Sequence, residues 1–409
     1  TREELPNGIT ILTRSNFNSP TISIKGYLNS GSLFDTDEKL GTSYLAANAL
    51  MTGTHQHDFQ SLYNEIESVG ARLGFSSGTL STSFSAHSLS EDLMLMLNLI
   101  SESLRSPAFP QKEFNRLKNQ LLTGLEIRAQ DTSAMAELLF DQITYAGHPY
   151  QRPDEGYIET VQTIEREDLV SFYQRTFGPR GMVLAIVGAV EPAVAVDAVR
   201  QTLGDWTNEN QEDLPEIPPA LPLQKTASKA ISIPGKSQSD IVMGCLAPDR
   251  LSPDYFPLRI GNNILGEFGM MGRLGQAVRE EAGLAYYAYS SFSATLGPGA
   301  WEMIAGVNPA KVDQTIGLIT QEIKQFVAEP VSDDELSDSK SLYLGRMPLI
   351  LESNDGVAIS LLNMERFSLG LDYFLNYPKM IKAVSAEEIL NASKKYLDPD
   401  RLAVAVAGP

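Results

Sequence analysis

The sequence has few of the side chains that bind metals or form covalent cross-links, with one cysteine and four histidines in 409 residues. The single Cys245 excludes an intrachain disulfide bond. Its place in the apolar run 241–248 favours a packed thiol over a reactive one. No apolar run approaches 18 residues, so we predict no transmembrane helix. No signal peptide is apparent, but residue 1 is Thr, so both a cytoplasmic chain and an exported chain whose signal has been removed stay open.

Positive charge is also scarce, since 32 Lys and Arg stand against 51 Asp and Glu, for a formal net charge of −19. Such a balance argues against binding to nucleic acid or to an anionic membrane surface. The hydrophobic content of 43% is enough for large cores, and the length favours more than one domain. These bounds describe a globular, acidic, multidomain chain.

Apolar periodicity predicts the elements of the first half. Residues 41–54 form a helix in which Leu45 and Ala49 share a buried face, and Gly53 ends it. Segments 8–14 and 20–28 are predicted as strands in a hairpin-like pair, and residues 71–89 as two antiparallel strands around Gly78. Further helices are predicted at 57–70, 91–104, 111–129, 133–145 and 165–176, followed by a strand at 181–188.

The second half repeats the first. Residues 167–188 align with 387–408 at a constant offset of 220, and residues 21–28 resemble 239–246. Between the halves, residues 207–228 hold four prolines and no periodic pattern, which is typical of an extended linker. We therefore predict an α+β fold with two homologous halves, 1–206 and 229–409, each a mainly antiparallel sheet packed with helices.

Residues 41–54 also fit the frame of the inverted zinc motif H-x-x-E-H, in which two His bind the metal and a Glu acts as base. The flanks LPNGITIL (5–12), NSGSLFDTDEKLGTS (29–43) and MTGT (51–54) resemble the insulinase/pitrilysin-like metallopeptidases (inverzincins) and the mitochondrial processing peptidases. The resemblance covers essentially the whole chain and implies the same duplicated fold. In that register the three chemical positions are Tyr44, Ala47 and Asn48, so the zinc motif is lost.

The resemblance also implies a third zinc ligand, a Glu on a later helix. Glu126 matches that place, and Asn119 stands where a further acidic residue is usual. One carboxylate is too few for a catalytic zinc, which needs about three protein ligands. The favoured interpretation of Glu126 is an ordinary residue of a helix surface. We expect no metal and no catalytic residue in this chain.

The strongest positive signal is in GRLGQAVREEAGLAYYAYSSF (272–292), where Arg279 and Tyr286 lie seven residues apart. The resemblance implies that a metal-free subunit supplies this Arg/Tyr pair to a peptide in its partner's active site. Arginine offers a fixed-charge fork for a carbonyl or an oxyanion, and the phenol adds a second donor. The alternative is a surface ion pair of Arg279 with Glu280 or Glu281, and a core Tyr286.

Other candidates are weaker. The glycine-rich stretch 266–275 fits neither phosphate-binding pattern. His55 and His57 have no acidic or Cys partner at a supporting spacing, and His148 is expected to be structural. Strand 71–77 is either an exposed sheet edge that binds peptide by strand addition or part of a plain hairpin.

The expected function is that of a non-catalytic subunit in a heterodimeric zinc metallopeptidase. The partner, a homologous subunit, would hold the zinc, and this chain would complete the peptide chamber with Arg279 and Tyr286. A second hypothesis is a non-enzymatic peptide-binding or scaffold protein like the core subunits of respiratory complexes, with a homodimer possible in isolation. A third, a self-sufficient peptidase with a rebuilt site, finds no ligand set in the sequence.

Overall fold

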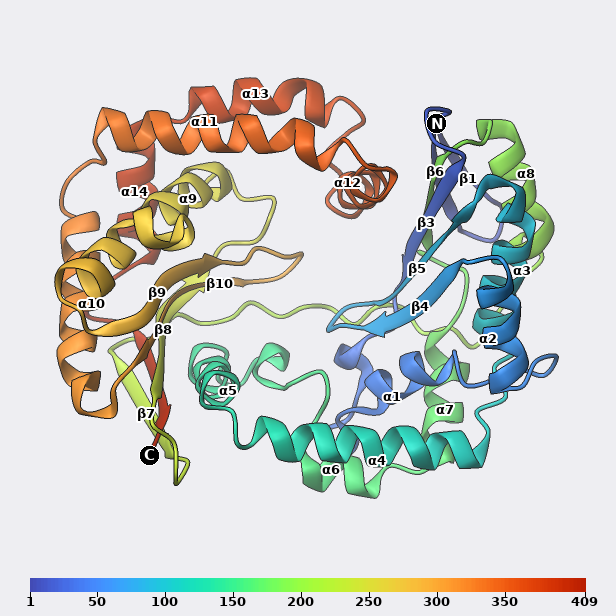
Figure 1. Cartoon of the computed structure of the whole chain (residues 1–409), viewed down its shortest axis with the longest axis horizontal. Coiled ribbons are helices and arrows are strands. Elements are labelled where there is room, and N and C mark those ends of the chain that lie inside the picture. Colours follow the sequence, from blue (N-terminus) through green and yellow to red (C-terminus); the bar gives the residue numbers. More distant parts are fainter. The chain divides into compact units, whose positions relative to one another are not determined.

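The computed structural model describes residues 1–269 and 271–409, which divide into two compact units. Unit 1 comprises Thr1–Leu125, Pro153–Glu216 and Pro348–Gly370. Unit 2 comprises Glu126–Arg152, Ile217–Met347 and Leu371–Pro409. Each unit is built on one β-sheet (Figure 1). None of the described helices is long and apolar enough to cross a membrane.

The sheet of unit 1 has the strand order β1-β2-β6-β3-β5-β4. Its strands are β1 (Arg2–Glu4), β2 (Thr10–Ser15), β3 (Thr21–Leu28), β4 (Arg72–Ser77), β5 (Thr82–Leu89) and β6 (Val183–Gly188). All neighbours pair antiparallel except β2 and β6, which run parallel. The predicted pairing of the first two long strands is wrong, because β6 lies between β2 and β3. The predicted antiparallel pair around Gly78 is confirmed as β4 and β5.

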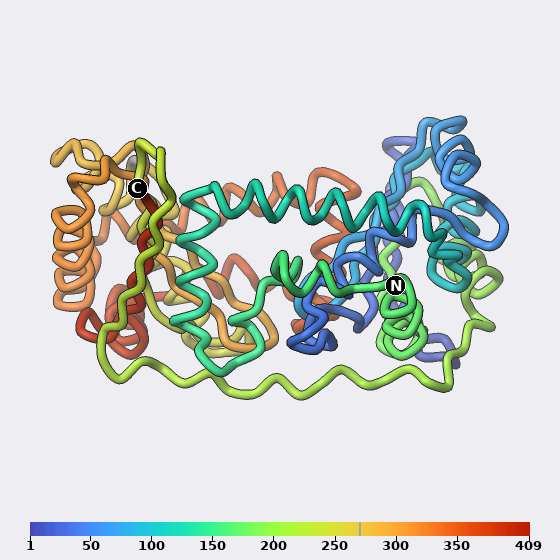
Figure 2. Tube along the Cα trace, turned by 90° about the horizontal axis from the view of Figure 1, so that it is seen from below, coloured from blue at the N-terminus to red at the C-terminus, as the bar shows by residue number. Residues whose placement is uncertain are grey.

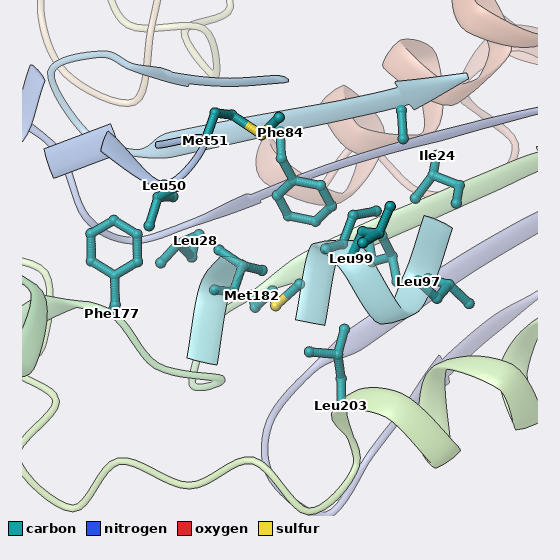
Figure 3. Close-up of a cluster of buried hydrophobic side chains, with 14 of the residues drawn as sticks. Ile24, Leu28, Leu50, Met51, Phe84, Leu97, Leu99, Phe177, Met182 and Leu203 are labelled. Atoms are coloured by element: carbon teal, nitrogen blue, oxygen red, sulfur yellow. The ribbon is translucent and has the colours of Figure 1, made fainter. Parts of the chain in front are cut away.

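One face of this sheet carries the large core of unit 1. It is covered by α1 (Thr42–Ala49), α2 (Phe59–Ser68), α3 (Leu93–Arg105) and α8 (Pro192–Leu203), with α7 (Arg166–Thr176) packed on α1. Figure 3 shows part of this core, in which Phe84 of β5 lies among buried aliphatic side chains such as Ile24 and Leu28. The short α6 (Ile158–Thr163) and helix α8 were not among the predicted elements.

The other face of the same sheet is covered by α12 (Asn354–Arg366), which contacts β3 and β6. Val357 and Ala358 pack there against a small apolar cluster that includes Tyr27 and Val187. The side chain of Asp355 fixes the start of the helix, since it accepts a hydrogen bond from Ser23 Oγ and lies 3.4 Å from Lys25 Nζ. A helix from near the C-terminal end of the sequence thus belongs to unit 1.

The sheet of unit 2 has the strand order β7-β11-β8-β10-β9. Its strands are β7 (Ala227–Ser232), β8 (Ser239–Ala247), β9 (Ala285–Phe292), β10 (Gly299–Val307) and β11 (Ala403–Gly408). Only β7 and β11 pair in parallel among its described strands. The order matches that of unit 1 strand for strand, from β2 onwards. The predicted duplicated, mainly antiparallel α+β fold is therefore confirmed.

Helices also cover both faces of the second sheet. One face is packed with α9 (Tyr255–Asn262), α10 (Val312–Phe326) and α14 (Ala386–Tyr396) around the fully buried Trp301. Helices α11 (Asp333–Ile350) and α13 (Tyr373–Ala383) contribute Tyr343 and Ile381 to the same core. The opposite face is covered by α5 (Thr132–Thr144), whose Phe140 packs on β8 and β11.

The two halves of the sequence therefore exchange a helix. Helix α4 (Gln111–Arg128) leads into α5 in the first half, and α11 leads into α12 in the second. Each second-half helix starts 222 residues after its first-half counterpart: α11 at 333 against α4 at 111, and α12 at 354 against α5 at 132. In each case the second helix of the pair packs on the sheet of the other half. The two compact units therefore differ from the predicted halves, 1–206 and 229–409, at two helical segments, 126–152 and 348–370.

The segment between the halves is extended, as its proline content predicts. Residues 207–226 contain no helix or strand, and β7 begins at Ala227, within the predicted linker (Figure 2). The segment is fixed at several points all the same. Asn208 Nδ2 donates to Phe177 O at 2.7 Å within unit 1, and His148 Nε2 donates to Pro218 O at 2.8 Å within unit 2.

Candidate functional site

Helix α1 presents the three positions of the lost zinc motif. It starts after Gly41, whose φ of 100° lies in the left-handed region that glycine adopts most easily. The buried Asp35 carboxylate accepts hydrogen bonds from the backbone N–H groups of Gly41 and Ser43, each at 3.0 Å. A negative charge there complements the positive end of the helix dipole. These hydrogen bonds to Asp35 fix the start of α1.

The side chains at the motif positions do not fit a zinc ion. Ala47 is fully buried and offers a methyl group. The amide of Asn48 donates from Nδ2 to Tyr44 O at 2.8 Å, one turn back in the same helix. Burial, followed by the charge of Glu155, raises the pKa of Tyr44, so its phenol is neutral at pH 7. These groups supply neither imidazole ligands nor a carboxylate base.

The remaining metal candidates do not form a site either. Glu126 is exposed on α4. His57 Nδ1 lies 3.0 Å from both carboxylate oxygens of Glu102, a hydrogen-bonded contact close to the core of unit 1. Across residues 1–269 and 271–409, no three His, Cys, Asp or Glu side chains are grouped so that they could hold a metal ion.

Arg279 and Tyr286 lie on neighbouring elements of unit 2, η7 and β9. Arg279 is on the π-helical segment η7 (Gly275–Glu281), whose Val278 is fully buried. Gly283, with a φ of 60°, turns the chain, and β9 starts two residues later. Short π-helical segments are frequent at functional sites.

Tyr286 owes its orientation to an irregularity of β9. Tyr287 is opposite Gly306 and Ala285 is opposite Val307, so Tyr286 is an extra residue without a partner on β10. Such a β-bulge redirects the side chain of the extra residue. Tyr286 is 60% exposed and is not a core residue.

Arg279 is also accessible, with 41% of its side chain exposed. Its ion-pair contact is with the adjacent Glu280, with 3.8 Å between Arg279 Nε and Glu280 Oε1. Exposed ion pairs of this length contribute about 0–1 kcal/mol. The alternative interpretation expected a surface ion pair for Arg279 and a buried position for Tyr286. The ion pair is present but weak, and the buried position for Tyr286 is wrong.

A cavity of about 600 Å³ lies beside Arg279, within unit 2. One wall is the edge strand β9, and the opposite wall combines the end of α9, the π-helical segment η5 (Asn263–Glu267) and Arg279 of η7. Gly266 allows η5 to lie directly on β9, since a Cβ at this position would be 2.5 Å from the Ser290 amide nitrogen. The lining residues that carry charge are Arg259, Glu267 and Arg279.

Arg259 and Glu267 were not among the site residues predicted from the sequence. Arg259 donates from Nη1 to Tyr255 Oη at 2.7 Å, and its guanidinium lies 5.2 Å from the ring centre of Tyr343. Glu267 Oε2 accepts from Asn262 Nδ2 at 3.2 Å and from Tyr343 Oη at 3.1 Å. The sequence signal for these two residues was one charge of each sign, eight residues apart, in an otherwise uncharged helical stretch.

A second group of charges lies on the face of the unit 2 sheet that α5 covers. Burial first, and then the carboxylates of Asp141 and Glu137, raise the pKa of Glu302 to about 7. Nearby, the Tyr287 hydroxyl donates a hydrogen bond to the buried Asp240 carboxylate. Glu302 is therefore a group whose charge changes near neutral pH.

A duplicated α+β fold with a zinc-motif helix that has lost its ligands defines a metallopeptidase-type chain. Comparison with known families agrees. Residues 10–155 match the model of the insulinase family, peptidase family M16, and residues 163–343 match the model of the M16 inactive domain. The chain belongs to peptidase family M16, and residues 163–343 are the part that matches the domain described as inactive.

The relatives include peptidases and a respiratory-complex subunit. An uncharacterized zinc protease of Mycobacterium leprae is 23% identical over 100% of this chain and 91% of its own. The β subunit of the mitochondrial processing peptidase of Lentinula edodes is 23% identical over 99% of this chain and 89% of its own. Subunit 1 of the mouse mitochondrial cytochrome b-c1 complex is 23% identical over 64% of this chain and 55% of its own.

Solved structures confirm the fold. The peptidase M16 inactive domain from Pseudomonas fluorescens matches with a TM-score of 0.93 and 24% identity, covering 100% of this chain and 97% of that one. A chain of complex III from Candida albicans matches with a TM-score of 0.82 and 16% identity, covering 100% of this chain and 95% of that one. At these identities the match establishes the fold alone.

Proposed function

We propose that this chain is the non-catalytic subunit of a two-chain zinc metallopeptidase. A homologous partner holds the zinc and the general base, and this chain completes the peptide chamber. Arg279 and Tyr286 bind the substrate at the partner's zinc site. The observation that carries the proposal is a contrast within one chain: α1 has no zinc ligands, whereas Arg279 and Tyr286 are both accessible and only weakly engaged.

The chemistry of the two side chains suits this role. A guanidinium donates charge-assisted hydrogen bonds to a carbonyl or to a developing oxyanion, and it stays charged at every physiological pH. A tyrosine hydroxyl donates a further hydrogen bond while neutral. Neither group replaces a metal or a base, so the proposed activity depends on the partner.

A scaffold role is the second candidate, and the likeness to cytochrome b-c1 complex subunit 1 and to a chain of complex III favours it. In that case the chain binds partner proteins, or a second copy of itself, without cleaving peptides. Arg279 and Tyr286 would then contribute to assembly or to peptide capture alone.

A quenched-fluorescent peptide assay on three samples tests the proposal. The samples are this chain alone, a candidate homologue with an intact H-x-x-E-H motif alone, and their mixture. We expect cleavage in the mixture only. A mixture no faster than the zinc-bearing homologue would contradict the subunit role and leave the scaffold role. Cleavage by this chain alone, with stoichiometric bound zinc, would show that the loss of ligands at residues 44–48 has been misjudged.

A further inference from the structure

The cavity beside Arg279 has an excess of positive charge. Of its charged lining residues, two are arginines and one is a glutamate. A volume of about 600 Å³ is within the usual range for ligand sites, about 300–1,000 Å³. What the cavity binds depends on how far these three charges are already neutralised by the protein itself.

The carboxylate of Glu267 is stabilised from several sides. It accepts the hydrogen bonds from Asn262 and Tyr343 described above, and Arg346 Nη1 lies 3.8 Å from its other oxygen. The nearby Asp240 also has donors, namely the Tyr287 hydroxyl and Gln238 Nε2 at 2.9 Å. Neutral donors stabilise these two carboxylates without cancelling their charge, and Arg346 is the cation that partly offsets Glu267. Asp240 is not among the residues that line the cavity, so the lining itself keeps an excess of one positive charge.

The two arginines are much less satisfied. Arg259 has five N–H donors, and its hydrogen bond within the described residues goes to Tyr255 Oη. It is a partly buried side chain, so its other donors have limited access to water. Among the residues that the structure describes, the ion-pair contact of Arg279 is the 3.8 Å one with Glu280, which is itself exposed. Unfilled donors of two cations thus line the same cavity, and an anionic acceptor is the group that satisfies them best.

The wall formed by β9 indicates that the anion belongs to a peptide. This strand is the last in the sheet order, and β10 is its pairing partner in the described part of the chain. An edge strand carries backbone N–H and C=O groups that can pair with an extended segment. The residues from Tyr287 to Phe292 line the cavity along this edge.

We propose that the cavity between β9, η5 and η7 binds a carboxylate of an extended peptide, with Arg279 as the accessible donor and Arg259 as the deeper one. The inference rests on the proposed peptide-binding role of Arg279 and adds the chemical class of the group that is recognised. A Glu or Asp side chain and a free C-terminus share this chemistry.

Fluorescence anisotropy with the full chain and labelled peptides tests the inference. The probes are pools of nonapeptides of Gly, Ala and Ser with blocked ends and one fixed Glu, and matched pools with Gln at that position. A third set keeps Gln but has a free C-terminal carboxylate. We expect at least one carboxylate set to bind about tenfold or more tightly than its neutral match, the effect of one charge-assisted hydrogen bond. The set that gains affinity tells the two sources apart.

Variants assign that preference to the cavity. Arg279→Gln should bring the affinity ratio between the carboxylate and neutral sets close to one. Arg401→Gln is the matched control, because Arg401 is equally exposed (43% against 41%) in the same unit but pairs with Asp398 at 2.7 Å. Equal binding of all sets, no binding of any set, or a ratio unchanged by Arg279→Gln would each overturn the inference.

The outcome is separable from that of the proposed function. Cleavage in the two-chain mixture without any preference for a carboxylate would reject the anionic subsite and keep the subunit role. Carboxylate-selective binding by this chain, with a mixture no faster than the partner alone, would reject the subunit role and keep the subsite.

Discussion

At the scale of single residues, the accessible arginines of unit 2 differ in how well their charges are compensated. Arg401 pairs with Asp398 across 2.7 Å, whereas Arg279 has a 3.8 Å contact with Glu280. Removing an exposed and weakly paired cation hardly changes the free energy of unfolding. Its removal is therefore a direct test of function.

Under the proposed function, Arg279→Ala should lower the peptidase activity of the two-chain mixture by about a hundredfold, the usual loss for one donor to a developing oxyanion. The thermal midpoint of this chain should stay unchanged, and Arg279→Lys should recover part of the activity. The assay is the quenched-fluorescent one, with Arg401→Ala as control. Full activity of a normally assembled Arg279→Ala mixture would remove Arg279 from the site.

A second residue-scale prediction concerns Glu302, whose pKa is raised to about 7 by burial and by its carboxylate neighbours. The folded state holds this proton more tightly than the unfolded state does, so the contribution to stability is present below pH 4.5 and is lost as the pH rises to about 7. Glu302→Gln should therefore raise the free energy of unfolding at pH 8 by about 3 kcal/mol. Urea titrations of both proteins at pH 5 and pH 8 measure the difference, and an equal change at both values would contradict the assignment.

Candidate residues could be predicted where the information is local in sequence. Tyr44, Ala47 and Asn48 occupy a fixed pattern on one helix, and Arg279 and Tyr286 lie on either side of a glycine turn. The cavity could not be predicted in this way. Its charges come from α9, η5 and η7, and only tertiary packing brings them to the same strand.

At the scale of elements, α5 is the clearest case of tertiary context overriding sequence position. Phe140 is fully buried against β8 and β11, although β8 begins 99 residues and β11 begins 263 residues further along the sequence. Phe140→Ala should lower the free energy of unfolding by about 3–5 kcal/mol, through lost burial and a cavity. Hydrogen exchange should show the loss of protection in the strands of unit 2. Phe17→Ala, at a 61% exposed position, is the control and should change neither quantity.

Most elements were predictable because periodicity and end signals agree, as for the helix that Gly70 ends and the strands on either side of Gly78. The pairing of β2 with β3 was not predictable from their closeness in sequence, because β6 comes from more than 150 residues away and lies between them. Helix α8 was missed although it is a regular amphipathic helix with Pro192 at its start, a signal that was available.

At the scale of the whole molecule, the internal repeat correctly predicted two similar sheets but not the exchange of helices between the halves. The repeat aligns α5 with α12 in sequence, and sequence similarity carries no information about which sheet each helix covers. Each sheet is covered by helices on both faces, and the helix on one of these faces comes from the other half of the sequence: α12 for the first sheet and α5 for the second.

The exchange predicts that the two halves depend on each other for folding. A fragment of residues 1–216 would expose the apolar face of α5 and leave β3 and β6 without α12, and a fragment of 217–409 would have the reciprocal defect. We expect each fragment alone to bind a hydrophobic dye and to melt without cooperativity. Mixed in equal amounts, the fragments should elute as one complex with a cooperative melt close to that of the intact chain. Two fragments that each unfold cooperatively and fail to associate would show that the exchanged helices contribute little to stability.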